Sequence, residues 1–175
     1  MLMDLLLAVA LVLPASGGSF AGDLQLQTTA FQPGATIPAQ FTCAGENGSP
    51  ALSWNQPPPR TQSFVLIVDD PDAPAGTWVH WVVYNLPASA RRLPDHVAAG
   101  DQQIDGAGKQ GLNDFHLSGY GGPCPPPGKP HRYFFRLYAL DTMLNLRSPV
   151  RRKGVDSAMR GHVLARGELM GTFGR

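Results

Sequence analysis

The chain of 175 residues has the length of one domain, with 43% hydrophobic and 15% charged residues. Its formal charge of +1 excludes the strongly basic field of a nonspecific nucleic-acid-binding protein, so we expect no nucleic-acid partner. The low charged share excludes charge-driven disorder, and 20 glycines with 17 prolines favour a loop-rich β protein with few helices.

The amino-terminal segment is typical of an export signal. The apolar run Leu5–Leu13 is followed by Pro14 and small residues, and it is shorter than the roughly 20 residues that span a bilayer. Ser19 and Ala21 offer a cleavage point, although no Lys or Arg precedes the run. We therefore expect residues 1–21 to be a signal peptide, residues 22–175 to form the exported periplasmic or secreted domain, and no transmembrane segment. The alternative is a short apolar tail.

Cys43 and Cys124 are the two cysteines, and neither belongs to a C-x-x-C motif. The absence of a C-x-x-C motif argues against a structural zinc site. In an oxidising compartment the pair could form one disulfide, which we expect here. Two buried free thiols are the alternative.

The first half of the domain predicts short strands followed by a buried one. Residues 24–28 alternate apolar and polar side chains, and residues 52–54 form a short extended piece among turns. Residues 63–68 are a continuous apolar, β-rich run that ends at Asp-Asp-Pro. This pattern predicts a central strand.

Two further strands carry histidines among aromatic residues. In residues 78–84, alternation predicts Trp78, His80, Val82 and Tyr84 on one face. Residues 131–140 repeat the pattern, with His131 and Tyr133 on one face. Residues 88–130 between them are mostly loop, and a connection of that length favours a functional role.

The predicted helix lies near the carboxyl end. Asp156 or Ser157 can cap it, a four-residue spacing continues through Val163, and Gly167 is placed to end it. A short closing strand is expected over residues 168–173. Residues 106–111 match G-x-G-x-x-G, but no strand precedes them and no helix follows, so we interpret them as a loop rather than a nucleotide site.

A carboxylate-ended strand and two histidine-bearing strands together suggest a small polar pocket in an apolar wall. Four stretches of the sequence carry a resemblance to a known family. They are the segment 69–74 (Asp-Asp-Pro-Asp-Ala-Pro), the strand beginning Trp-Val-His-Trp, the loop Gly-Tyr-Gly-Gly-Pro-Cys with His-Arg-Tyr after it, and the stretch 161–165. From about residue 24 to 173, the sequence resembles the phosphatidylethanolamine-binding protein (PEBP) family, in particular its bacterial, Raf-kinase-inhibitor-like branch.

The resemblance implies a mainly β fold, with a large central β-sheet flanked by a smaller sheet and few helices. It also implies an anion pocket for phosphate-bearing ligands or phospholipid head groups, with no cofactor. The ligand-binding residues that it implies are Asp70, Asp72, Trp78, His80, Tyr120, Gly121, Gly122, Pro123, His131 and Tyr133. The connection after Pro74 is shorter than in eukaryotic members, which argues against kinase-type partner recognition.

Two other function classes stay open. Asp70, His80 and His131 also make a two-histidine, one-carboxylate set, which could serve a metal-dependent or His/Asp-dependent hydrolase, although no activated nucleophile is evident. An inhibitor that binds a protease or kinase through the pocket rim and the long loop is the other alternative. We expect a non-enzymatic binding protein with a regulatory role, because the pocket residues suit reversible anion binding.

Overall fold

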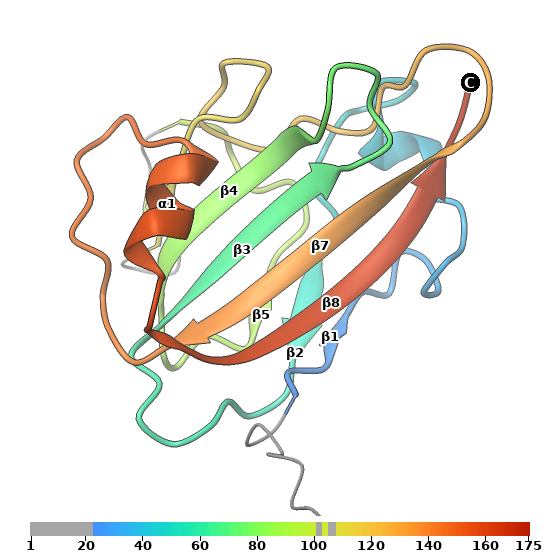
Figure 1. Ribbon diagram of the computed structural model, residues 1–175. Coiled ribbons are helices and arrows are strands. Elements are labelled where there is room, and N and C mark those ends of the chain that lie inside the picture. Colours follow the sequence, from blue (N-terminus) through green and yellow to red (C-terminus); the bar gives the residue numbers. More distant parts are fainter. Residues whose placement is uncertain (1–22, 101–102, 105–107) are drawn as a thin grey trace, which may run out of the picture.

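The computed structural model describes residues 23–100, 103–104 and 108–175, which form two antiparallel sheets and one short α-helix (Figure 1). The elements in chain order are β1 (Leu26–Gln27), the 3-10 helix η1 (Ala39–Phe41), β2 (Leu52–Trp54), β3 (Ser63–Asp70), β4 (Trp78–Pro87), β5 (Arg92–Leu93), β6 (Lys109–Gln110), β7 (His131–Leu140), α1 (Arg152–Ala158) and β8 (Val163–Phe173).

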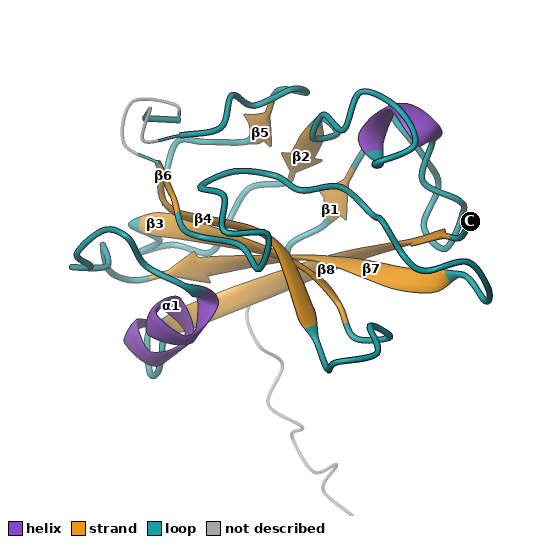
Figure 2. Cartoon of the chain, turned by 90° about the horizontal axis from the view of Figure 1, so that it is seen from above, coloured by secondary structure: helices purple, strands orange, loops and turns teal. Residues whose placement is uncertain are grey.

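The larger sheet has the strand order β6-β4-β3-β7-β8, and the smaller sheet has the order β1-β2-β5. Helix α1 lies on one side of the larger sheet and the smaller sheet lies on the other (Figure 2). The expected mainly β architecture, with a large central sheet, a smaller sheet and few helices, is confirmed.

Strand β3 is central, as its unbroken apolar run predicts. It pairs with β4 on one side and β7 on the other, and all of its residues are buried. Its side chains alternate between two hydrophobic clusters. Phe64, Leu66 and Val68 face the smaller sheet, whereas Val65 and Ile67 face α1. This alternation sends Asp69 and Asp70, the last two residues of β3, to opposite faces.

The predicted alternation of β4 is wrong at one point, because the strand contains a β-bulge. Val68 pairs with Trp81 and Asp69 pairs with Val79, so His80 is the extra residue. Trp81 belongs to the cluster under the smaller sheet, and Val82 belongs to the cluster under α1. The bulge therefore breaks the predicted face, and His80 does not share a face with Val82.

The carboxyl-terminal prediction is also corrected. Helix α1 ends at Ala158, and Val163 already begins β8, which pairs with β7 along its whole length. Buried residues in β8 recur every second position from Ala165 to Phe173, a strand period that the four-residue spacing obscured. Gly167 does not end a helix. A Cβ there would lie 2.2 Å from the backbone oxygen of Leu24, so this glycine permits close approach between chain segments.

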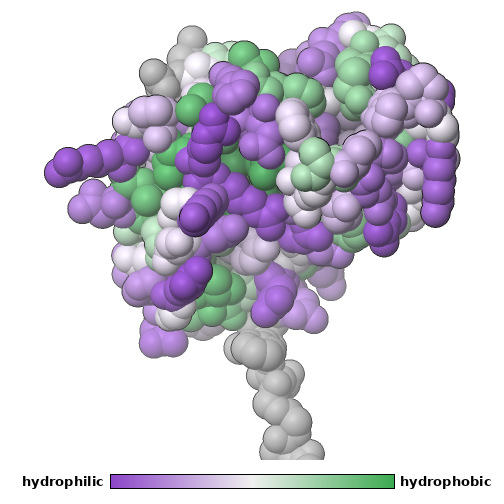
Figure 3. Space-filling view, turned by 45° about the horizontal axis from the view of Figure 1, so that its top comes forward, coloured by the Kyte–Doolittle hydropathy of each residue, from purple (hydrophilic) through white to green (hydrophobic). Residues whose placement is uncertain are grey.

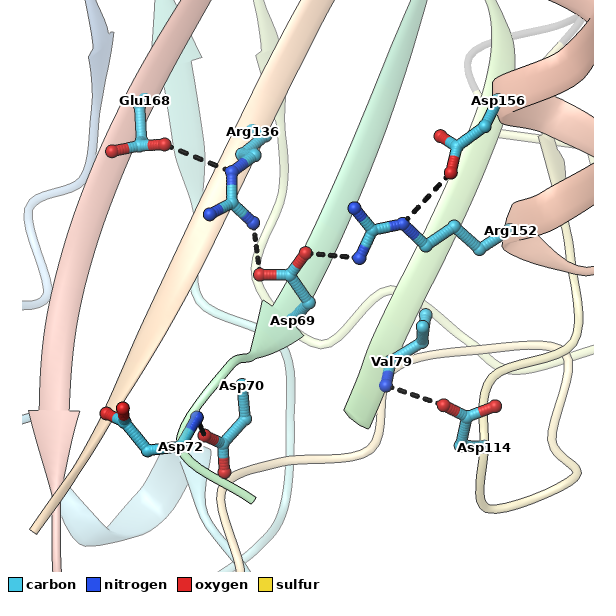
Figure 4. Close-up of polar contacts among 9 residues, drawn as sticks. All are labelled: Asp69, Asp70, Asp72, Val79, Asp114, Arg136, Arg152, Asp156 and Glu168. Carbon is cyan, nitrogen blue, oxygen red and sulfur yellow. Dashed lines mark hydrogen bonds and ion pairs between the residues drawn. The ribbon is translucent and has the colours of Figure 1, made fainter. Parts of the chain in front are cut away.

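Asp69 connects α1 to the larger sheet. Its carboxylate is 1% exposed and accepts hydrogen bonds from Arg136 of β7 and Arg152 of α1 (Figure 4). Arg136 also contacts Glu168 at 3.0 Å, and Arg152 contacts Asp156 at 3.2 Å. One buried carboxylate thus holds a strand and a helix on the same face.

Cys43 and Cys124 form a disulfide, as expected, across a sequence separation of 81. Across the described residues, no helix combines the length and apolar character needed to cross a membrane. The expected signal peptide lies outside the described residues, as does part of the G-x-G-x-x-G segment.

Candidate functional site

A cavity of about 340 Å³ lies where β3 ends and where β4 and β7 begin. These strand ends meet at the upper edge of the sheet in Figure 1. Figure 3 shows the surface with this edge turned toward the reader, and apolar residues (green) lie there among polar ones (purple). The cavity is lined by three polar side chains and an otherwise mostly apolar set: Asp70, His80 and His131, with Ala73, Pro74, Ala75, Trp78, Phe115, Cys124, Pro125 and Pro126.

His131 is oriented by Asp70. Its Nδ1–H donates to Asp70 Oδ2 at 2.8 Å, and the two side chains are 12% and 5% exposed. The other Asp70 oxygen accepts a hydrogen bond from the backbone N–H of Asp72 at 2.8 Å (Figure 4). Both Asp70 oxygens are therefore engaged within the protein, and Nε2 is the His131 nitrogen available to a ligand.

His80 is oriented by a backbone carbonyl. Its Nδ1 lies 2.5 Å from the Gly121 oxygen, and because a carbonyl only accepts, Nδ1 carries the proton. Burial lowers the pKa of His80 below its usual 6.5, although the Gly121 carbonyl and the Asp70 charge oppose this effect. The single N–H of neutral His80 is thus already used, and its Nε2 can donate only after it gains a proton.

Aromatic side chains pack around the two imidazoles. The ring of Phe115 meets Trp78 and His80 edge-on, each at 5.4 Å between centroids, and Tyr133 meets His80 at 5.2 Å. Trp78 Nε1–H is buried without a hydrogen-bond partner among the described residues, whereas the buried Tyr133 hydroxyl lies beside Asp70. The Trp78 indole is therefore a donor on the cavity wall that the protein leaves unpaired.

Besides Asp72, five of the residues expected to bind ligand do not line the cavity: Tyr120, Gly121, Gly122, Pro123 and Tyr133. The Tyr120 hydroxyl donates to the Phe41 carbonyl at 2.8 Å, and burial raises the pKa of this phenol. Gly122 N–H donates to Asn47 Oδ1 at 2.8 Å. A Cβ on Gly122 would lie 2.5 Å from the Phe41 oxygen, so this position requires a glycine. These residues hold the wall in place.

Asp72, whose role the sequence left less certain, lies at the rim. The Arg132 side chain donates to it through Nε at 2.9 Å and through Nη2 at 2.7 Å. The hydrogen bonds from the Arg132 side chain lower the pKa of Asp72 from 3.8 to about 2. Asp72 therefore remains ionised and paired, and its backbone N–H helps to fix Asp70.

The sequence pattern missed much of the apolar wall. Ala73, Ala75, Phe115 and Pro126 lie in loops without a periodic pattern, and their proximity depends on the fold. Asn113 was also missed. Its buried side chain donates to the backbone oxygens of His80 and Gly119 at 3.2 and 3.0 Å, which holds the loop that carries Phe115.

The arrangement offers two imidazoles, each fixed through Nδ1, on the wall of one mostly apolar cavity. When protonated, both Nε2 atoms become charged donors, a suitable combination for an oxyanion. Within the ranges 23–100, 103–104 and 108–175, no group of three or more His, Cys, Asp or Glu side chains is arranged to hold a metal ion.

Comparison with known proteins relates the chain to one family over most of its length. The family model described as phosphatidylethanolamine-binding protein matches residues 27–174. A UPF0098 protein of Methanothermobacter thermautotrophicus is 47% identical over 152 residues, covering 87% of this chain and 99% of its own length. A UPF0098 protein of Aquifex aeolicus is 42% identical over 163 residues, covering 92% of both chains. None of these names is that of an enzyme.

Two solved structures share the fold. A phosphatidylethanolamine-binding protein homologue from Chlamydia trachomatis superimposes with a TM-score of 0.79 at 40% identity, covering 87% of this chain and 98% of its own. E. coli YbcL, described as a member of the mammalian PEBP family, gives a TM-score of 0.81 at 32% identity, covering 88% and 99%. The chain therefore belongs to the phosphatidylethanolamine-binding protein family.

Proposed function

We propose that the cavity reversibly binds a phosphate or phosphate-like group of a small molecule or a phospholipid head group. The observation that carries this proposal is the pair of imidazoles, His80 and His131, both fixed through Nδ1 on the wall of one cavity. Two charged N–H donors in an apolar surrounding interact strongly with an oxyanion, because solvent competes little there. The proposed role is that of a binding protein.

The hydrogen-bonding groups around the cavity favour a ligand with several hydrogen-bond acceptors. Trp78 Nε1–H adds an unpaired donor beside the imidazoles. Burial, the neighbouring Asp70 charge and a hydrogen bond to Asp70 raise the pKa of Tyr133, which keeps its hydroxyl protonated. Asp70 opposes an anion through its charge, but both of its oxygens already accept hydrogen bonds. The ligand therefore meets more donors than free acceptors.

The names of the relatives support the same ligand chemistry. The matching family model is described by phosphatidylethanolamine binding, and the Chlamydia trachomatis structure is called a homologue of such a protein. A phosphodiester head group presents oxygens that suit the donors of the cavity. The binding of phosphate-type ligands by this chain is our proposal from those names and from this site.

Calorimetric titration with inorganic phosphate and with phosphorylethanolamine at pH 6 tests the proposal. We expect His80→Asn and His131→Asn each to weaken binding by about 10- to 100-fold, the effect of losing one charge-assisted hydrogen bond. His162→Asn is a matched control, because His162 pairs with Asp141 at 2.8 Å, as His131 does with Asp70, but on the surface. Equal affinities in all four proteins would rule the assignment out.

We also propose that the chain is exported after removal of residues 1–21. The disulfide supports this, because such bonds persist in oxidising compartments, and both of its cysteines are exposed. Expression of the whole chain in a bacterial host, followed by fractionation and amino-terminal sequencing, tests the proposal. A product that begins at Gly22 in the periplasmic or secreted fraction supports it, whereas an intact amino terminus in the cytosol contradicts it.

A further inference from the structure

A second cavity adjoins the first and is not used by the function proposed above. It has a volume of about 350 Å³ and shares two residues, Pro126 and His131, with the first cavity. Its remaining lining is Asp72, Pro127, Gly128, Lys129, Pro130 and Arg132. One imidazole and one proline thus line both cavities, which are similar in size.

The charges around the second cavity favour an anion. Asp72 and Arg132 neutralise each other through two side-chain hydrogen bonds. Lys129 is exposed and takes part in none of the ion pairs formed by the described residues. Asp70, the carboxylate that lines the first cavity, is already paired with His131. Among the side chains that line the second cavity, the uncompensated charge is therefore the Lys129 ammonium.

The same hydrogen bonds argue against a cationic group on the part of a ligand that lies in the second cavity. An ammonium group would need a free carboxylate, but Asp70 accepts from His131 and from the Asp72 backbone, and Asp72 accepts from Arg132. Asp70 and Asp72, the two side-chain carboxylates that line the cavities, thus both accept hydrogen bonds within the protein. A second acid group, in contrast, finds Lys129 without a partner among the described residues.

The wall formed by residues 124–130, which lines both cavities, is held by contacts at both ends. The disulfide fixes Cys124, and the Arg175 guanidinium donates to the Pro125 carbonyl at 2.7 Å. Gly128 N–H donates to the Arg175 carbonyl at 3.1 Å. Proline residues have little backbone freedom, so this wall loses little entropy when a ligand binds.

We infer that the two cavities form one extended site for ligands with two acid groups, the first held by His80 and His131 and the second by Lys129. This inference rests on the proposed function, because it assigns the first acid group to that site. The ligand class is a bis-anion, such as a compound with two phosphate or phosphonate groups or with a phosphate and a carboxylate. Phosphorylethanolamine, which carries one acid group and an ammonium group, lacks the second contact.

A series of alkane bisphosphonates with one, two or three methylene groups between the phosphorus atoms tests the inference by calorimetry, with inorganic phosphate and phosphorylethanolamine as references. At pH 6 and low salt, we expect at least one bisphosphonate to bind about tenfold more tightly than phosphate, as one further charged contact provides. Phosphorylethanolamine should bind no more tightly than phosphate.

Lys129→Gln should abolish the gain and leave the phosphate affinity unchanged. Lys153→Gln, an exposed lysine on α1, is the matched control and should retain the gain. If phosphate binds in a His80-dependent manner but no bisphosphonate gains affinity, or if the gain persists in Lys129→Gln, the extended site is refuted and the proposed function stands. If phosphate itself does not bind, both fail.

Discussion

Removal of the Cys43–Cys124 disulfide should lower the stability of the domain by up to about 4.5 kcal/mol. The bond closes a loop with a sequence separation of 81, and the loop-closure relation for that length gives this value at 25 °C. Both cysteines are exposed, so replacement by alanine creates little cavity cost. The predicted loss therefore comes mainly from the added freedom of the unfolded chain.

Urea unfolding of the double variant Cys43→Ala/Cys124→Ala measures the loss, and the melting temperature should fall by roughly 10–15 °C for a domain of this size. Dithiothreitol should destabilise the unaltered protein by a similar amount and leave the variant unchanged. Three hydrogen bonds still join the two segments: Cys43 N–H to Pro123, Gly122 N–H to Asn47, and Tyr120 to Phe41. A loss below about 1 kcal/mol would refute the loop-entropy argument.

Three further predictions concern charged groups. Asp69→Asn should lower the free energy of unfolding, measured in urea, by about 2–3 kcal/mol. The loss is smaller than for an isolated buried ion pair because each arginine keeps a second carboxylate partner. A loss below about 0.5 kcal/mol would contradict this prediction. Because Asp72 has a folded pKa of about 2 against 3.8 unfolded, its contribution is present above pH 4 and lost as the pH falls toward 2. We expect less than about 1 kcal/mol for this partly exposed pair, and acid titrations of Asp72→Asn should lack it. The affinity for sulfate should fall as the pH rises from 5 to 8, a range in which sulfate itself carries no proton. His80 loses its proton over this range because burial lowers its pKa, and its Nε2 must be protonated to donate to the anion. A sulfate affinity that does not change with pH would contradict this prediction.

Sequence periodicity predicted the strands that lie in the core. β3 and β4 contain long apolar runs, and burial on both faces makes such runs easy to recognise. β7 alternates buried and less buried residues, which is the period of a strand. The carboxyl-terminal part was misassigned because Gly167 resembles a helix stop, whereas its true partner, Leu24, is far away in the sequence. A glycine required by a nonlocal contact cannot be distinguished from a capping glycine by local pattern alone.

The site was predictable where side chains follow strand geometry and not where they depend on loops. Asp70, His80 and His131 line the cavity as expected because each lies at or near a strand end. The β4 bulge was not predicted, because a one-residue slip in pairing leaves no mark in the pattern of one strand. The long loop was predicted, but the contact of Phe115 with His80 was not, because it depends on how that loop folds back.

The neighbouring carboxylates Asp69 and Asp70 have a practical consequence for engineering. Asp69 anchors α1 on one side of the sheet, and Asp70 lines the cavity of the proposed function on the opposite side, although the two residues are adjacent in the chain. Designers can therefore diversify the loops around Asp70 to obtain new specificities while the clamp at Asp69 stays untouched. The larger sheet therefore insulates the ion pairs that anchor α1 from changes made at the cavity.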